Sequence, residues 1–120
     1  MELGKVINAR KALESLADEE GISTHLAYWM TKFVVTTGNE YKFYTSEMRK
    51  LLSKYAETKD DNTVFIPSER VAEFNKAIDI LNGTDVEDPG IRFKLSELSA
   101  ELKLSMKQMY PLLDFIDEDK

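Results

Sequence analysis

The chain contains no cysteine and only one histidine. Without cysteine there is no disulfide framework, no thiolate nucleophile and no zinc–sulfur site. His25 alone could give a zinc ion one nitrogen ligand. It also falls in the first turn of an expected helix, where the positive end of the helix dipole disfavours an imidazolium. We therefore expect neither a metal centre nor a histidine-based catalytic site.

The motifs that cradle phosphates or build nucleophilic sites are also missing. The five glycines are scattered, so there is no Walker A loop and no dinucleotide fingerprint, and no G-x-S-x-G elbow occurs. Carboxylates cluster at 18–20, 60–61, 85–88 and 117–119, but none of these clusters matches a calcium-binding loop. We expect no enzymatic activity, no cofactor, no metal and no small-molecule substrate.

Long apolar runs are absent as well. The first twenty residues alternate charged and apolar side chains and lack the apolar core of a signal peptide. No stretch is apolar for long enough to span a bilayer as a helix. Together with the lack of cysteine, this favours a cytoplasmic protein that does not enter a membrane.

The chain has 120 residues, of which 42% are hydrophobic and 32% are charged, as expected for one globular domain covering residues 1–120. Its formal charge of −6 is unevenly distributed. Residues 1–59 hold nine basic and eight acidic side chains, whereas residues 60–120 hold seven basic and fourteen acidic ones. The acidic half should repel nucleic acid, so general binding to a phosphate backbone is disfavoured.

Two helices are predicted in the first half of the chain. Val6, Ala9, Leu13 and Leu16 form one apolar stripe, which predicts a helix over 3–20 that ends near Gly21. Ser23 or Thr24 caps a second helix over about 24–57, and the short connection makes the two helices an αα-hairpin. The stripe of the second helix repeats at alternating three- and four-residue spacing through Val34, Thr37, Tyr41, Tyr44, Met48, Leu51 and Tyr55.

The second helix has one weak place and one unusual property. Residues 34–39, Val-Val-Thr-Thr-Gly-Asn, have low helix propensity, so a kink or a break there stays open. The helix is also nearly twice as long as its partner in the hairpin. Its second half must therefore pack on the C-terminal half of the chain or on another subunit.

The second half of the chain is predicted to combine short helices with a small ribbon. Two strands, 63–66 and 91–95, could pair with each other and need a helix behind them. The expected helices cover 68–82, 96–103 and a segment that begins with a capping box at Ser105 and Gln108 and kinks near Tyr110, because Pro111 follows. The fold class is therefore mainly α, of the α+β type, with a helical hairpin (1–58), a ribbon with short helices (59–116) and an acidic tail (117–120).

The second helix carries more aromatic and basic side chains than a hairpin core requires. A packing seam flanked by solvated lysines is the ordinary interpretation. Aromatic rings among basic side chains can also stack on single-stranded nucleic acid, and tyrosine, tryptophan, methionine and arginine are enriched at the centres of protein interfaces. The residues predicted to contact a partner are Trp29, Phe33, Tyr41, Tyr44, Met48, Arg49 and Tyr55.

The chain also resembles small phage or prophage proteins of unknown function. The resemblance rests on Ile7-Asn8-Ala9 with Leu13 and Leu16, on Ala27-Tyr28, and on Glu40, Arg49, Leu52 and Tyr55. It continues through a phenylalanine-centred helix from Phe74 to Leu81, an acidic loop, a short strand and Phe115-Ile116. The resemblance implies an origin in a mobile element, a bacterial host cytoplasm, and a role in virion assembly or interference with a host protein. It transfers no site.

Three functional hypotheses follow from the sequence. The first is a non-enzymatic protein–protein interaction module, a phage accessory or assembly protein, which includes self-association through residues 34–55. The second is an acidic mimic of nucleic acid that blocks a host DNA-binding protein. The third is a binder of single-stranded nucleic acid that uses the second helix.

Overall fold

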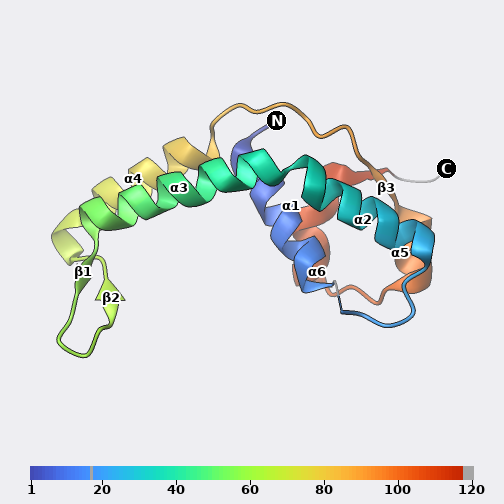
Figure 1. The fold of residues 1–120 in the computed structure, drawn as a ribbon, viewed down its shortest axis with the longest axis horizontal. Coiled ribbons are helices and arrows are strands. Elements are labelled where there is room, and N and C mark those ends of the chain that lie inside the picture. The colour runs from blue at the N-terminus through green and yellow to red at the C-terminus, as the bar shows by residue number, and fades with distance from the viewer. Residues whose placement is uncertain (17, 118–120) are drawn as a thin grey trace.

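The computed structural model describes residues 1–16 and 18–117 and consists of a body with a projecting arm (Figure 1). The radius of gyration is 17.0 Å and the principal extents are 50 × 32 × 23 Å. A compact domain of this length would have a radius of gyration of roughly 14 Å. The molecule is therefore elongated, and the arm accounts for the extra length.

The described residues form six α-helices, two 3-10 helices and two sheets of two strands each, which confirms the predicted mainly α fold class of the α+β type. In chain order the elements are α1 (Leu3–Ser15), α2 (Thr24–Thr36), α3 (Gly38–Tyr55), β1 (Glu57–Thr58), β2 (Val64–Phe65), η1 (Ser68–Arg70), α4 (Val71–Asn82), β3 (Phe93–Lys94), α5 (Leu95–Glu101), α6 (Met106–Met109), η2 (Tyr110–Phe115) and β4 (Ile116–Asp117).

The core of the body is built around three phenylalanines that come from distant parts of the chain. Phe33 lies 6.2 Å from Phe93 and 4.9 Å from Phe115, measured between ring centroids, and all three side chains are fully buried. Strands β3 and β4 pair in parallel, with Phe93 opposite Ile116, so the ladder holds two of these rings in place. The hydrophobic cluster thus joins α2 to the C-terminal segments.

Helix α1 packs on both parts of the molecule. Val6, Ala9 and Leu13 belong to the body core, while Leu3 and Ile7 pack with Leu81 of α4 in a second, smaller cluster. Helix α1 packs against α2 and α3, as expected of the predicted hairpin, but it crosses them steeply (Figure 1). It also contacts α4 and η2. Helix α1 therefore fixes the arm to the body.

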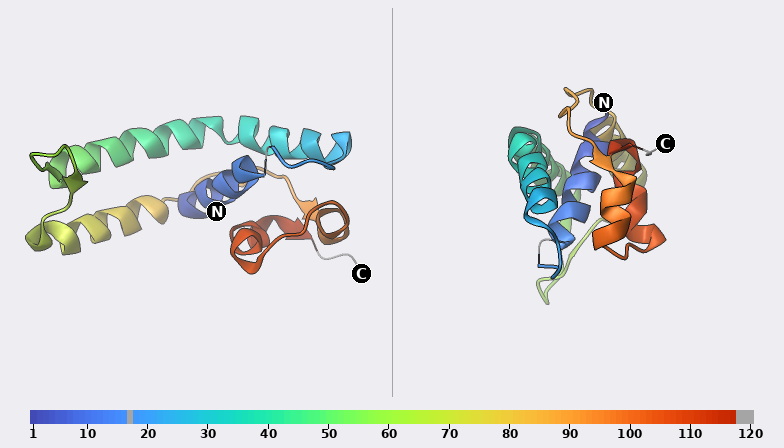
Figure 2. Two further views of the ribbon diagram at one scale, coloured as in Figure 1. Left: turned by 90° about the horizontal axis from the view of Figure 1, so that it is seen from below. Right: turned by 90° about the vertical axis from the view of Figure 1, so that its right-hand side faces the viewer.

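The predicted long helix over 24–57 is divided at Thr37 into α2 and α3, so the question of a break that the sequence left open is settled. The division falls where β-branched residues are followed by Gly38, which is the weak place in the sequence. Thr37 is buried, and its hydroxyl donates a hydrogen bond of 2.7 Å to the carbonyl oxygen of Phe33. Backbone hydrogen bonds continue across the joint, and the two helices remain roughly in line (Figure 2).

The arm consists of α3, the tip formed by β1 and β2, and the returning α4 (Figure 1). In the tip, Glu57 pairs with Phe65 and Thr58 with Val64, antiparallel, and Asn62 takes a left-handed conformation with φ of 68°. The predicted pairing of 63–66 with 91–95 is wrong. Closing a five-residue loop costs less chain entropy than joining segments almost thirty residues apart, and β3 pairs with β4 instead.

The remaining boundaries follow the sequence more closely. Helix α1 ends at Ser15 rather than at residue 20, because Asp18-Glu19-Glu20 would place negative charge at the negative end of its dipole. The predicted capping box is confirmed, since the Ser105 hydroxyl accepts from the Gln108 amide at 3.2 Å and the Gln108 side chain accepts from the Ser105 amide at 2.9 Å. Pro111 lies at the start of η2, as the predicted kink requires. Of the acidic tail, residues 118–120 lie outside the described part.

Gly4 permits a close approach of α1 to the end of α4. A Cβ atom at this position would lie 2.9 Å from Cβ of Asn82, the last residue of α4, whereas a Cβ at Gly38 would meet nothing within 4 Å. We expect Gly4→Ala to lower the free energy of unfolding by about 1–3 kcal/mol, because α1 and α4 must move apart. Urea unfolding followed by circular dichroism measures this effect.

Gly38→Ala is the matched control for that substitution. It exchanges the same atoms in an open helical site and should stabilise the protein by up to about 1 kcal/mol. Equal destabilisation by both substitutions would contradict a close contact at Gly4.

Candidate interaction surface

The residues predicted to contact a partner do not form one surface. Phe33 is fully buried in the body core, so it contributes to packing and cannot contact a partner in this structure. Trp29 lies on α2, 39% exposed, with its ring at 5.4 Å and edge-on to Tyr28. The other five predicted residues belong to α3 and the arm.

Tyr41 and Tyr44 form the joint between α3 and α1. The Arg10 guanidinium lies 4.2 Å from the centroid of the Tyr41 ring, and the Lys11 ammonium lies 5.7 Å from that of Tyr44. Arg10 also donates a hydrogen bond of 2.8 Å to the carbonyl oxygen of Val34. Since cations of α1 cover these rings, the two tyrosines orient the arm and are only partly accessible.

The inner seam of the arm, where α3 faces α4, contains Tyr55 and Phe74 in edge-on contact at 6.0 Å. Tyr55 is buried and Met48 is half-buried, whereas Arg49 is exposed to solvent. Of the predicted contact residues in the arm, Tyr55 and Met48 thus serve the seam, and Arg49 remains accessible.

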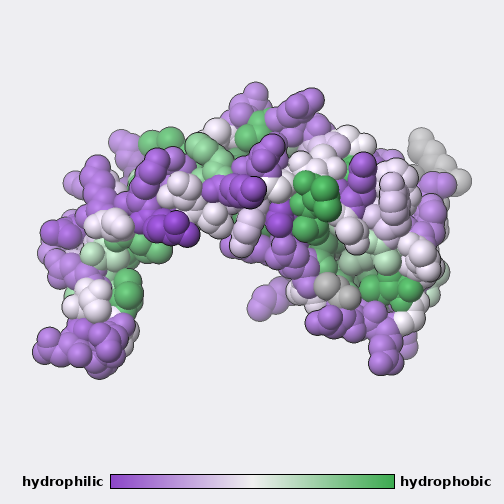
Figure 3. All heavy atoms as spheres, viewed as in Figure 1, coloured by the Kyte–Doolittle hydropathy of each residue, from purple (hydrophilic) through white to green (hydrophobic). Residues whose placement is uncertain are grey.

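The arm also carries an accessible face that the sequence-based prediction did not single out. We call it the outer face of the arm and define it by two stripes of side chains at helical spacing: Phe43, Glu47, Leu51 and Lys54 on α3, and Glu73, Ala77 and Ile80 on α4. Phe43 is 46% exposed and Ile80 is 67% exposed, while Leu51 and Ala77 are half-buried. Figure 3 shows hydrophobic atoms between hydrophilic ones along the upper edge of the arm.

Both stripes lie on the same side of the arm. Each is displaced in the same rotational sense from the Tyr55–Phe74 seam, and in two antiparallel helices such positions face the same way. The spacing 43, 47, 51, 54 was a signal in the sequence. It was hidden because Leu51 also belongs to the stripe of larger residues from Tyr41 to Tyr55, which dominates the periodicity.

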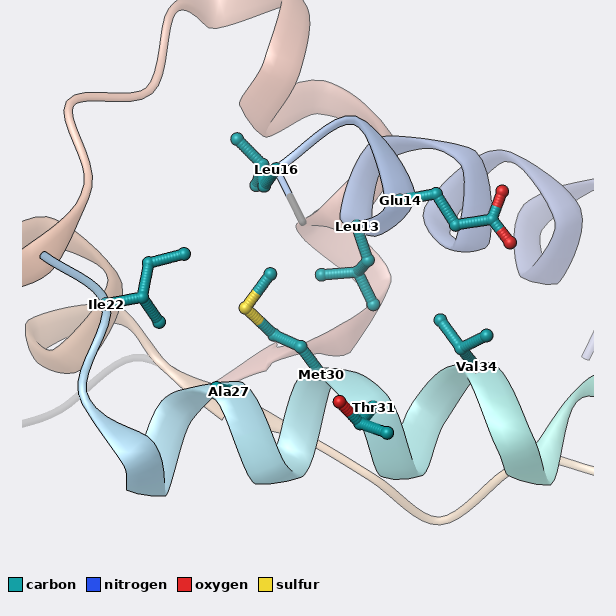
Figure 4. A pocket seen from close by; sticks show the side chains of 8 residues that line it. All are labelled: Leu13, Glu14, Leu16, Ile22, Ala27, Met30, Thr31 and Val34. Atoms are coloured by element: carbon teal, nitrogen blue, oxygen red, sulfur yellow. The ribbon is translucent and has the colours of Figure 1, made fainter. Parts of the chain in front are cut away.

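The body has an apolar groove between α1 and α2, with Leu13, Leu16, Ile22, Met30 and Val34 directed toward it (Figure 4). Its volume of about 250 Å³ is below the range of roughly 300–1,000 Å³ that is typical of small-molecule sites. Glu14 and Thr31 supply the polar part of its lining. The groove can accept an apolar side chain of a binding partner.

A second hollow, of about 340 Å³, lies beside Trp29 and is lined by polar groups of α2, α5 and the strand β3. His25 and Glu97 face each other there, with Nδ1 and Oε1 2.7 Å apart. At its edge, Arg92 forms a salt bridge with Asp88 at 2.6 Å and places its guanidinium 5.2 Å from the centroid of the Phe115 ring. These contacts attach the loop after α4 to the body core.

The shifted carboxyl groups of the described residues have structural causes. Hydrogen bonds from the Arg92 guanidinium and from the Gly90 amide lower the pKa of Asp88 from 3.8 to about 2, and the same pair raises the pKa of Arg92. A hydrogen bond from Thr63 lowers the pKa of Asp61 in the tip. Among residues 1–16 and 18–117, no group of three potential metal ligands comes together and no helix is long and apolar enough to cross a membrane.

Comparison with known proteins gives no relative, because no family model, curated protein or solved structure matches the chain.

The Asp88–Arg92 pair predicts a pH-dependent contribution to stability. Because folding lowers the pKa of Asp88, the contribution is present above the unfolded value of 3.8 and is lost as the pH falls toward 2. The carboxylate is 42% exposed, which limits the contribution to less than about 1 kcal/mol. We expect Asp88→Asn to lower the free energy of unfolding at pH 7 and to have a much smaller effect at pH 2.

Urea unfolding at several pH values measures this difference. Asp60→Asn, in the exposed tip, is the control and should follow the wild-type pH dependence. A loss of stability in Asp88→Asn that stays constant from pH 7 to pH 2 would refute the assignment.

Proposed function

We propose that the protein is a non-enzymatic protein–protein interaction module and that the arm is its binding element. The main support is the small number of buried side chains in the arm. Of the thirty residues of α3 and α4, both fully described, only Tyr55 and Leu81 are buried. Helices whose apolar side chains stay accessible to solvent in the free protein often form binding surfaces.

The shape of the molecule supports the same proposal. The arm extends from the body between a β tip and a helical joint, so both of its helices remain approachable from the outer side (Figures 1 and 3). Arg10 and Lys11 of α1 hold the base of the arm through Tyr41 and Tyr44. A preoriented arm loses less conformational freedom on binding than a mobile one would.

We further propose that the module acts in the cytoplasm of a bacterial host as a phage accessory or assembly protein, on the basis of the sequence resemblance given above. Of the two other hypotheses, acidic mimicry of nucleic acid has weaker support. Several carboxylates of the second half are neutralised locally, as in the pairs of Asp88 with Arg92, of Asp114 with Lys5 and of Asp85 with the N-terminal ammonium. A mimic of a phosphate backbone would need its charges free and aligned.

Substitutions on the outer face of the arm test the proposal. We expect Phe43→Glu and Ile80→Glu to abolish saturable binding of a protein partner, measured by chemical cross-linking and mass spectrometry in host lysate and with the purified chain. Both side chains are exposed, so the folded state should tolerate the change.

Val35→Glu is the matched control. Val35 is 71% exposed on α2, outside the arm, and its substitution should leave binding intact. The proposal fails if the wild-type chain binds no protein at all, itself included, or if both arm variants bind as well as the wild type.

A further inference from the structure

We propose that the partner of the outer face is the same face of a second copy, so that two arms form a four-helix bundle around a two-fold axis. This inference rests on the proposed function of the arm as a binding element. Its support comes from three properties of the outer face: its apolar centre, the relative level of its residues along the arm, and its distribution of charge.

The apolar centre of the face consists of Ala77 and Ile80, with Phe43 nearer to the body. Leu51 lies at the edge of the face, where it also packs against the cluster of Leu3, Ile7 and Leu81. Ile80 lies in the last turn of α4, and it is two-thirds exposed although the neighbouring Leu81 is buried. The small side chain of Ala77 leaves room for a second helix to approach. Antiparallel helical hairpins commonly bury such stripes by packing as pairs into four-helix bundles.

The Tyr55–Phe74 contact fixes which residues of α3 and α4 lie at the same level. Because the helices are antiparallel, counting back along α3 and forward along α4 places Leu51 level with Ile78, so Ile80 lies about 3 Å further along the arm, toward the body. By the same count Lys54 is level with Asn75, and Glu73 lies about 3 Å further toward the tip. Near each of these two heights along the arm, α3 and α4 contribute one residue each. Leu51 and Ile80 are both apolar, and Lys54 and Glu73 carry opposite charges.

A two-fold axis parallel to the helices places α3 of one copy on α4 of the other at the same level. Leu51 then lies opposite Ile80 of the second copy, and Lys54 lies opposite Glu73 of the second copy, each with an offset of about 3 Å that the side chains can span. The symmetry makes each contact twice. In the described part of the single chain neither Lys54 nor Glu73 forms a salt bridge. The Lys54 ammonium lies 5.2 Å from the centroid of the Tyr55 ring, and in the pairing its charge would also meet a carboxylate.

The charge of the whole arm favours the same arrangement. Helix α3 holds four basic and two acidic residues, a net of +2, while residues 57–82 hold three basic and six acidic ones, a net of −3. The rest of the chain has a net charge of −5. Two copies therefore repel each other least along their arms, where α3 of one lies on the acidic returning segment of the other.

Sedimentation equilibrium on the full chain tests self-association. We expect a concentration-dependent mass that approaches twice the 13.8 kDa of one chain. Ile80→Glu should weaken the association at least a hundredfold, because it places a carboxylate in the apolar centre, and Val35→Glu should leave it unchanged. Circular dichroism establishes that both variants are folded.

A charge exchange tests the pairing itself. Lys54→Glu and Glu73→Lys should each weaken the dimer roughly tenfold, since each replaces two attractive pairs by two repulsive ones. An equimolar mixture of the two variants should recover wild-type affinity, and so should the double variant, because opposite charges face each other again. Repulsion within one arm would not be relieved by mixing, so recovery in the mixture reports only contacts between copies.

A strictly monomeric wild-type chain overturns this inference, and so does a dimer that is insensitive to Ile80→Glu or that the mixture of charge variants fails to restore. The proposed function fails on a different result. A monomer that still loses a heterologous partner on Ile80→Glu would refute the second copy as partner and retain the arm as the binding element.

Discussion

The burial of α1 on two sides is the constraint on which the rest of the structure depends. Val6, Ala9 and Leu13 complete the body core, and Leu3 and Ile7 complete the cluster at the base of the arm. A helix buried on two sides cannot rotate to optimise one side without exposing the other. The direction in which the arm leaves the body therefore follows from the order of apolar residues in the first helix. The close approach of Gly4 to Asn82 leaves little freedom to change it.

The same constraint explains why α2 and α3, which lie roughly in line, pack in different environments. The α2 half contributes Leu26, Met30 and Phe33 to the body core, and the α3 half extends beyond the reach of α1, where only α4 covers its inner side. Thr37 marks the change between the two environments. Its hydroxyl is satisfied by the helix backbone, although burial of Thr37 removes it from solvent. The outer face of the arm remains accessible because no further segment of the described chain covers it.

Much of the fold could be predicted from the sequence, because helical periodicity, capping residues and breakers are local signals. The apolar stripes of α1 and α4 and the capping box at Ser105 are examples. Strand pairing could not be predicted in the same way, since two-residue strands carry almost no periodicity and their partners depend on packing. The pairing of Phe93 with Ile116 is decided by the burial of Phe93 and Phe115 against Phe33, a contact between three distant segments. The burial of several predicted contact residues could not be foreseen for a related reason. One helical stripe does not reveal which side a later helix will cover, and α4 and α1 cover the side with the larger residues.

The separation of the hydrophobic residues into two clusters has a consequence for the dynamics of the chain. The body cluster is several times larger than the one at the base of the arm, and the outer half of the arm is held by the Tyr55–Phe74 contact, the short β1–β2 ladder and the exposed Glu57–Arg70 salt bridge. Local opening requires less free energy where fewer apolar contacts are lost. Backbone amides of the outer arm should therefore exchange with deuterium through subglobal opening while those of the body remain protected. Whatever covers the arm would slow that exchange, so folding of the arm and occupancy of its outer face are thermodynamically linked.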